Sequence, residues 1–425
     1  MSRTDAAAPR VLPRVLLVSP VYPAPDTPRA GIFVHRQAVQ LAAAGMAVHV
    51  LALRPAPPRF PRWLVSRSWL RYYARRPAWP RRPDGIPVTT VFYPRRWTTG
   101  EDVVPAMGEA LVRAAGRHPR LRENAVVYTQ WLWPGGAAAL ALRAAFGLPV
   151  AAIARGSEMH DWHAAHPECR PHVERVLREA DLLLANCEAL REPAEALLPG
   201  AGERMTVVYN GCDAEAFRPA AGPDARAALR RELGVAGGER LLVFCGALSE
   251  RKGMPELAAA WRTFSALHPA WRLLLLGSGP RPADLGERAS CLGELPSAQV
   301  LRWLQAADGY VQPSRLEGLA NATMEAMAAG LPVVTTATCG QTELVRSEPG
   351  EDENGWLVPP KDPAALAAAL TELAADPERA RRRGEAARRT IVERFDPRAE
   401  AARLAGLLAG LAAARPALQA RAAER

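Results

Sequence analysis

The chain has 425 residues, of which 49% are hydrophobic and 23% charged, as is typical of globular proteins with two or three domains. No apolar run approaches the roughly 18–20 residues of a membrane-spanning helix, which argues against a transmembrane protein. The formal net charge is +10. The six cysteines include no C-x-x-C pair, so neither a zinc knuckle nor a disulfide framework is predicted.

Short apolar runs alternate with helical stretches in the first half of the chain. Residues 14–19 are predicted to form a first strand, because a long apolar region and a small-residue cleavage site of an export signal are missing. Further strands are predicted at 47–53, 125–129, 149–154, 181–186 and 205–210. This alternation is typical of parallel sheets with helices on both faces.

Residues 54–97 follow the second predicted strand and carry the whole excess of positive charge. They contain eleven arginines and one acid, Asp84, which leaves 43 basic and 43 acidic residues elsewhere. Aromatic residues such as Trp63, Trp69 and Tyr72 lie between the arginines, and the prolines predict a loop with short helical turns. The segment is interpreted in three ways: it binds nucleic acid, it binds an anionic membrane surface, or it is a solvated insertion.

The second half repeats the alternation and suggests a second domain. Its strands are predicted at 240–246, 271–277, 309–314 and 332–336. Proline and glycine cluster at 217–224, as is typical of a domain boundary. We therefore expect an α/β fold with two Rossmann-like domains, residues 1–218 and 219–397, which face each other across a cleft. The C-terminal helix, at about 398–425, is expected to pack back on the first domain.

The stretch "EGLANATMEAMAAG" follows the predicted strand that ends near Ser314. Ligands of open parallel sheets bind beyond the carboxyl ends of the strands, and a helix N-terminus there favours phosphate. Gly318 would let the backbone approach such a ligand, Glu317 could accept hydrogen bonds from hydroxyl groups, and Glu325 could reach a ribose diol. This pattern fits a nucleotide sugar. The alternative is that Glu325 is a solvated helix residue and Glu317 a partner of the helix dipole.

A second polar turn, in "FCGALSERKGMPEL", follows the first strand of the second domain. Its Lys252 is one of only two lysines in the chain. A cation at this place could neutralise a diphosphate leaving group, and the alternative is an ordinary surface turn.

Four motifs together resemble the retaining glycosyltransferases of family 4, which have the GT-B fold. They are the two glutamates of E-x7-E with "EAMAAGLPVV", the G-x5-K-G turn, "YNGCDAEAF" and "NGWLVPPKDPAALAAAL". In the first domain, "GIFVHRQAVQLAAAG", "TQWLWPGG" and "IARGSE" resemble the bacterial polysaccharide branch, which includes enzymes of the teichuronic acid type.

The resemblance implies roles for individual residues. Glu317 would hold hydroxyl groups of the donor sugar, and Glu325 the ribose. The diphosphate would be bound by Lys252 and by backbone amides of four residues, Gly318, Leu319, Ala320 and Asn321. Gly31 would lie against the donor phosphates, and the backbone from Leu292 to Glu294 would bind the base.

Two positions depart from the family pattern. The arginine that often follows the glycine of the strand-end turn is replaced by Ala247, and Arg251 is the candidate to supply its charge. In "IARGSE", Arg155 stands where many members have a histidine close to the reacting sugar. Arg155 could stabilise phosphate charge, but it cannot act as a base because it stays protonated.

The stretch "SEMHDWHAAH" contains five residues that could ligate a metal: Glu158, His160, Asp161, His163 and His166. Its spacing is not H-E-x-x-H, and the chain contains no Asp-x-Asp. We therefore expect no metal and no cofactor, with the helix dipole and basic residues acting on the diphosphate instead.

The predicted function is the transfer of a sugar, with retention, from a nucleotide-sugar donor to a hydroxyl acceptor in polysaccharide or glycolipid biosynthesis. The resemblance favours the membrane interpretation of residues 54–97, because acceptors in the family are often lipid-linked. The protein is expected in the cytoplasm, peripherally on the inner face of the membrane, without nucleic acid as a partner. The alternatives are a nucleotide-sugar epimerase of the same fold and a basic nucleic-acid-binding protein.

Overall fold

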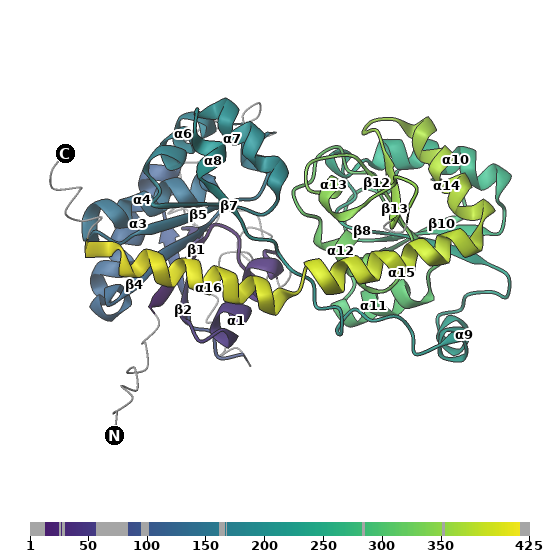
Figure 1. Cartoon of the computed structure of the whole chain (residues 1–425), viewed down its shortest axis with the longest axis horizontal. Coiled ribbons are helices and arrows are strands. Elements are labelled where there is room, and N and C mark those ends of the chain that lie inside the picture. Colours follow the sequence, from purple (N-terminus) through teal and green to yellow (C-terminus); the bar gives the residue numbers. More distant parts are fainter. Residues whose placement is uncertain are drawn as a thin grey trace, which may run out of the picture. The chain divides into compact units, whose positions relative to one another are not determined.

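The computed structural model describes residues 13–24, 27, 30–56, 84–94, 102–160, 166, 168–282, 285–350 and 353–416. They form two compact units, both visible in Figure 1. Unit 1 holds the described residues up to Asn186, residues 190–208 and the last helix from Arg398 onward. Unit 2 holds residues 187–189 and 209–397, so the chain passes between the units earlier than the expected boundary at 218.

Unit 1 is built on a seven-stranded sheet with the order β3-β2-β1-β4-β5-β6-β7, in which every neighbouring pair is parallel. Its strands are β1 (Arg14–Ser19), β2 (Ala47–Pro55), β3 (Val88–Tyr93), β4 (Ala125–Gln130), β5 (Val150–Ala154), β6 (Leu182–Ala185) and β7 (Met205–Val207). Alternate residues of β1 enter different cores, because successive side chains of a strand point to opposite faces.

Helices cover both faces of this sheet. They are α1 (Ile32–Ala43), α3 (Val104–Arg117), α4 (Ala137–Phe146), α6 (Cys169–Glu179), α7 (Arg191–Leu197), α8 (Ala201–Arg204) and α16 (Pro397–Ala413). Helices α1 and α16 share one core with the sheet, and α3 and α4 share the other (Figure 1). Helix α16 contributes Leu404, Leu408 and Leu411 to the first of these cores.

Strand β3 corrects the expectation for the basic segment. Residues 54–97 were expected to form a loop with short helical turns, but Val88–Tyr93 pairs with β2 along its whole length. The sequence "VTTVFY" is rich in β-branched and aromatic residues, which favour strands. The part of the segment at 57–83 lies outside the described residues.

Unit 2 contains a six-stranded parallel sheet with the order β10-β9-β8-β11-β12-β13. The strands are β8 (Arg240–Cys245), β9 (Trp271–Leu276), β10 (Ala289–Gly293), β11 (Gly309–Gln312), β12 (Val333–Thr336) and β13 (Gly355–Val358). Four of them, β8, β9, β11 and β12, occupy predicted positions and form the centre of the sheet.

The helices of unit 2 also form two layers. They are α9 (Pro223–Glu232), α10 (Met254–Leu267), α11 (Ser297–Ala306), α12 (Asn321–Ala328), α13 (Gln341–Leu344), α14 (Pro363–Ala375) and α15 (Pro377–Arg394). Helices α11, α12 and α15 pack on one face of the sheet, and α10 and α14 on the other (Figure 1). None of the helices among the described residues is long and apolar enough to span a bilayer.

The strand order decides where a ligand can bind in unit 2. From β8 the chain runs outward to β9 and β10, and then returns to β11 on the other side of β8. The connections that leave β8 and β11 therefore turn to opposite sides of the sheet, and doubly wound sheets bind ligands at such a switch point. The two motifs singled out in the sequence, with Lys252 and with Glu317, lie in these two loops.

Candidate active site

The site begins with an ion pair between two residues that are far apart in the sequence. Lys252 Nζ lies 2.5 Å from Glu317 Oε2, and both side chains are largely buried, with 16% and 14% of their surface exposed. Lys252 ends the 3-10 turn Glu250–Lys252 after β8, and Glu317 belongs to the loop after β11. The switch point of the sheet thus brings together the two groups that the sequence assigned to the diphosphate and to the sugar.

Gly253 holds the lysine turn against the other loop. Its φ is +73°, and a Cβ atom at this position would lie 1.8 Å from the carbonyl oxygen of Pro313. Only glycine adopts this conformation readily and leaves room for the carbonyl. The glycine after Lys252 therefore lets the lysine turn pack directly against the loop that carries Glu317.

Helix α12 presents its amino end beside this ion pair. It begins at Asn321, and its N-cap residue, Ala320, makes no side-chain hydrogen bond to the first turn. Leu319 and Ala320 are buried, and Leu319 is part of the core, so both would offer a ligand their backbone and not their side chains. Free N–H groups and the positive end of the helix dipole favour a phosphate at this place.

Glu325 lies one turn into α12 and is half-buried, unlike a fully solvated helix residue. It shares its surroundings with Glu317, because both charges act on the buried Tyr310. Burial raises the pKa of Tyr310 well above its ordinary value, and the charges of Cys245, Glu325 and Glu317 raise it further. The two glutamates of the E-x7-E motif therefore both lie near this tyrosine of β11.

The motif "YNGCD", at the start of unit 2, forms a hydrogen bond with the first residue of α12. The Asn210 side-chain amide donates a hydrogen bond of 3.1 Å to Asn321 Oδ1, and the Tyr209 hydroxyl donates one of 3.0 Å to Glu343 Oε2. In the sequence, this motif indicated only the resemblance to the family. Its structural role in holding the first residue of α12 depends on contacts that the spacing could not show.

The remaining donor-site candidates in unit 2 are Arg251, in the lysine turn, and Leu292, in β10. Arg251 is exposed, and its backbone oxygen accepts a hydrogen bond of 2.9 Å from the Arg315 amide. Leu292 lies near the end of β10 and packs partly against the core. Next to it, Glu294 accepts a 2.6 Å hydrogen bond from Ser278.

Gly31 and Arg155 belong to unit 1. Gly31 precedes α1 with φ +67°, and a Cβ there would lie 2.4 Å from the Val21 carbonyl oxygen. Arg155 follows β5 and is buried, with hydrogen bonds to Gln130 Oε1 (3.0 Å) and Gln37 Oε1 (3.1 Å). Burial lowers the pKa of Arg155, and its guanidinium is held among neutral amides inside the unit. The two glutamines were not predicted as site residues, although each is a polar residue in an apolar element.

Glu158 has a structural task. Its Oε1 accepts hydrogen bonds from the amides of Arg155 (2.8 Å) and Leu132 (3.2 Å), and burial raises its pKa. Of the five metal-ligand candidates around it, Asp161 and His163 lie outside the described residues. The residues that the structure does describe contain no group of three side chains able to hold a metal.

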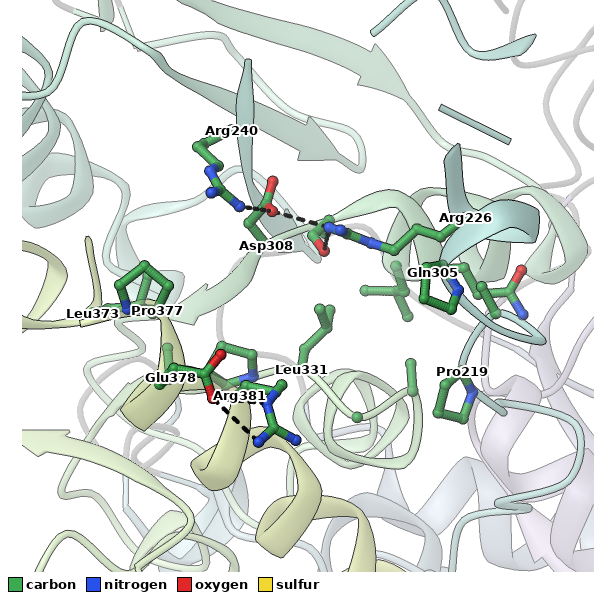
Figure 2. A pocket seen from close by; sticks show the side chains of 18 of the residues that line it. Pro219, Arg226, Arg240, Gln305, Asp308, Leu331, Leu373, Pro377, Glu378 and Arg381 are labelled. Carbon is green, nitrogen blue, oxygen red and sulfur yellow. Dashed lines mark hydrogen bonds and ion pairs between the residues drawn. The ribbon is translucent and has the colours of Figure 1, made fainter. Parts of the chain in front are cut away.

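A cavity of about 510 Å³ lies at the opposite, amino-terminal edge of the unit 2 sheet (Figure 2). Asp308 on its wall accepts hydrogen bonds from Arg226 (2.9 Å), Arg230 (3.1 Å) and Arg240 (3.0 Å). Burial opposes ionisation of Asp308, yet hydrogen bonds from Leu241 and Arg226 keep its pKa below the ordinary value. These arginines are thus engaged in joining α9, β8 and β11, at the other edge of the sheet from Lys252 and Glu317.

Comparison with known proteins agrees with this geometry over most of the chain. The family model described as Glycosyltransferase Family 4 matches residues 30–216, and the model described as Glycosyl transferases group 1 matches residues 239–376. The chain is 26% identical to the putative teichuronic acid biosynthesis glycosyltransferase TuaC of Bacillus subtilis, over 84% of this chain and 88% of TuaC.

A mycobacterial relative decides the family. The GDP-mannose-dependent alpha-(1-6)-phosphatidylinositol monomannoside mannosyltransferase of Mycolicibacterium smegmatis is 30% identical over 74% of this chain and 82% of its own length. The chain belongs to glycosyltransferase family 4. The predictions of an enzyme of the hexosyltransferase type and of this family are confirmed.

Solved structures of other glycosyltransferases share the fold. Sucrose-phosphate synthase from Thermosynechococcus elongatus has a TM-score of 0.73 at 22% identity and covers 95% of this glycosyltransferase and 100% of its own chain. Anabaena HepE in complex with UDP-glucose has a TM-score of 0.68 at 18% identity and covers 94% and 100%. The prediction of an α/β GT-B fold is confirmed.

Proposed function

We propose that this glycosyltransferase moves a hexosyl group from a nucleotide-sugar donor to a hydroxyl acceptor with retention of configuration. The observation that carries the proposal is the Lys252–Glu317 ion pair beside the uncapped amino end of α12. It offers one carboxylate for sugar hydroxyl groups, and one cation with free amides for a diphosphate. HepE, which has this fold, has been crystallised with UDP and with UDP-glucose.

The reaction breaks the bond between the sugar C1 atom and the diphosphate oxygen, and forms a bond from C1 to the acceptor oxygen. Negative charge grows on the departing diphosphate, where Lys252 and the α12 amides stabilise it. Since no carboxylate is assigned as a nucleophile, the acceptor attacks from the face that the diphosphate leaves. Its proton passes to an oxygen of the departing phosphate, which balances the step.

Charge stabilisation by Lys252 and the amides makes a metal ion unnecessary in this mechanism, and we propose that the enzyme uses neither a metal nor a cofactor. The acceptor belongs to polysaccharide or glycolipid biosynthesis, with lipid-linked sugars among its forms. We further propose that the basic residues of 54–97 hold the enzyme on an anionic membrane surface facing the cytoplasm. TuaC and the mycobacterial mannosyltransferase, whose names include teichuronic acid and a phosphatidylinositol mannoside, support an acceptor of this kind.

A screen of nucleotide sugars by thermal unfolding tests the donor. A ligand at about 100 times its dissociation constant should add about 2.7 kcal/mol to the free energy of unfolding. The donor is then incubated with and without candidate acceptors in EDTA, and the anomeric configuration of the product is read by NMR. Conversion of the donor alone into another nucleotide sugar would instead show an epimerase.

Lys252→Ala tests the role of the cation. Because the diphosphate charge develops after binding, turnover should fall by a larger factor than donor affinity. Single-turnover rates and calorimetric binding constants give the two factors separately. Equal turnover in the variant and the parent would remove Lys252 from the mechanism.

A further inference from the structure

Arg315 lies two residues before Glu317 and reaches to both sides of Lys252. Its Nε donates a hydrogen bond of 2.8 Å to Glu256 Oε1 in the first turn of α10, and its Nη1 binds Glu250 at the start of the lysine turn. Its backbone amide donates to the carbonyl oxygen of Arg251 at 2.9 Å. Arg315 therefore forms hydrogen bonds with residues before Lys252 and with a residue after it.

The loop that carries Arg315 is itself held firmly. The Gln312 side-chain amide donates to Ser314 Oγ at 2.9 Å, and the Thr336 hydroxyl donates to the Ser314 carbonyl oxygen at 2.5 Å. Ser314 is fully buried. Arg315 thus projects from a fixed point at the end of β11 and can serve as a brace for the more exposed lysine turn.

The charges around Lys252 give the brace a second task. Glu250 and Glu256 both lie close to Lys252 in the chain, and without Arg315 each could compete with Glu317 for the ammonium group. Glu256 is only 9% exposed, and its Oε2 already has no hydrogen-bond partner among the described residues. Arg315 occupies both competing carboxylates, which leaves the ammonium of Lys252 to Glu317.

We propose that Arg315 is a positioning residue, which keeps Lys252 aimed at Glu317 and at the donor diphosphate by holding Glu250 and Glu256. The predicted effect of Arg315 on turnover depends on the proposed function. Its effect on the side chain of Lys252 does not, because that effect can be measured without any substrate. Lysine at 315 keeps the charge but not the fork of two separate donors, so it restores the arrangement in part.

Amine labelling measures this positioning directly, because Lys252 and Lys361 are the only lysines of the chain. Lys361 is exposed and serves as the internal reference. Acetylation of the full-length protein, followed by mass spectrometry, should show Lys252 reacting several-fold more slowly than Lys361. In Glu317→Gln, which removes the partner of the ammonium group, Lys252 should be acetylated faster relative to Lys361 than in the parent. Arg315→Gln should raise this relative rate toward the same value, and Arg315→Lys should give an intermediate rate.

Turnover gives the second readout. In Arg315→Gln, kcat should fall by up to about a hundredfold, since a small displacement of a catalytic group has effects of that order. The KM for the donor should change much less, because α12 and Glu325 stay in place. Arg315→Lys should shift both readouts in the same direction by less, with little loss of stability, and it replaces Arg315→Gln if that variant does not fold.

Arg226→Gln is the matched control. Arg226 is 35% exposed, compared with 25% for Arg315, and bridges to a carboxylate at the opposite edge of the same sheet. Its loss should lower the unfolding temperature and leave the labelling ratio and kcat unchanged. If Arg315→Gln, or Arg315→Lys where the glutamine variant does not fold, leaves both the labelling ratio and kcat as in the parent, the positioning role is refuted. A changed labelling ratio in a protein that turns over no nucleotide sugar would refute the proposed function alone.

Discussion

Glu317 lies in the loop before α12 and Glu325 lies within the helix, so we expect them to serve different parts of the donor. Glu317 is paired with Lys252, whereas Glu325 lies a turn into α12. Glu325→Gln should weaken the nucleotide sugar and the bare nucleoside diphosphate by similar factors. Glu317→Gln should lower turnover while nucleoside diphosphate affinity stays nearly intact. Each lost charge-assisted hydrogen bond would cost about 1.5–3 kcal/mol.

Calorimetric titration with the nucleoside diphosphate, together with turnover of the full donor, separates these effects. Glu232→Gln is a suitable control, because Glu232 pairs with Arg302 on the exposed surface of unit 2, at 2.5 Å. The control should change neither quantity. A similar loss of nucleoside diphosphate affinity in Glu317→Gln and Glu325→Gln would contradict the division of roles.

The residues of this site could be predicted to different degrees. Lys252 and Glu317 could be assigned to one crevice, because each follows an apolar run and the carboxyl ends of parallel strands share an edge. The contacts of Arg315 and Asn210 could not, since their partners Glu256 and Asn321 lie 59 and 111 residues away. Nothing in local spacing indicates such pairs, which depend on how the loops fold over the sheet.

At the scale of the elements, most apolar strands were predicted, whereas the mixed strands β3 and β10 and the short apolar strand β13 were not. Most strands of both sheets are continuous buried runs, and a run of that kind stands out in any sequence. Strand β3 has half-buried residues and lies among prolines and arginines, whose composition indicated a loop. Its β-branched and aromatic residues favour a strand, and it pairs with β2 despite the composition that surrounds it.

His49 ties β3 to β2 and makes this edge of unit 1 sensitive to acid. Its Nε2 lies 2.8 Å from Thr89 Oγ1. Burial, followed by the charges of Arg14 and His118, lowers the pKa of His49 from 6.5 to about 4. The unfolded chain therefore binds a proton at this position more readily than the folded protein, and stability should decrease as the pH falls from about 6.5 to about 4.

His49→Gln should remove part of this pH dependence. Urea unfolding at pH 7 and pH 5 measures it, and the difference in free energy of unfolding between the two values should be smaller in the variant than in the parent. Thr89→Val loses the hydrogen bond but keeps the titrating ring, so it should lower stability at both pH values and preserve the difference. An unchanged difference in His49→Gln would show that His49 does not titrate in this window.

At the scale of the whole molecule, the distribution of charge separates one segment from the rest of the chain. Outside residues 54–97 the 43 basic and 43 acidic residues balance, so the segment alone should respond to an anionic surface. Each basic residue that reaches such a surface contributes about 1 kcal/mol, and an inserted tryptophan adds to this. Two or three contacts would give reversible binding that high salt reverses.

Sedimentation with lipid vesicles tests this expectation. The protein should sediment with vesicles containing anionic lipid, detach in high salt and ignore neutral vesicles. Replacing Arg71, Arg75 and Arg76 by serine should weaken vesicle binding and the use of a lipid-linked acceptor, while nucleoside diphosphate binding to unit 2 stays unchanged. A variant with serine at the exposed Arg382 and Arg389 of α15 and at Arg403 of α16 has the same net charge and should bind vesicles like the parent. If the parent ignores anionic vesicles even at low salt, the basic segment does not hold the enzyme at a membrane, and a soluble acceptor becomes the better hypothesis.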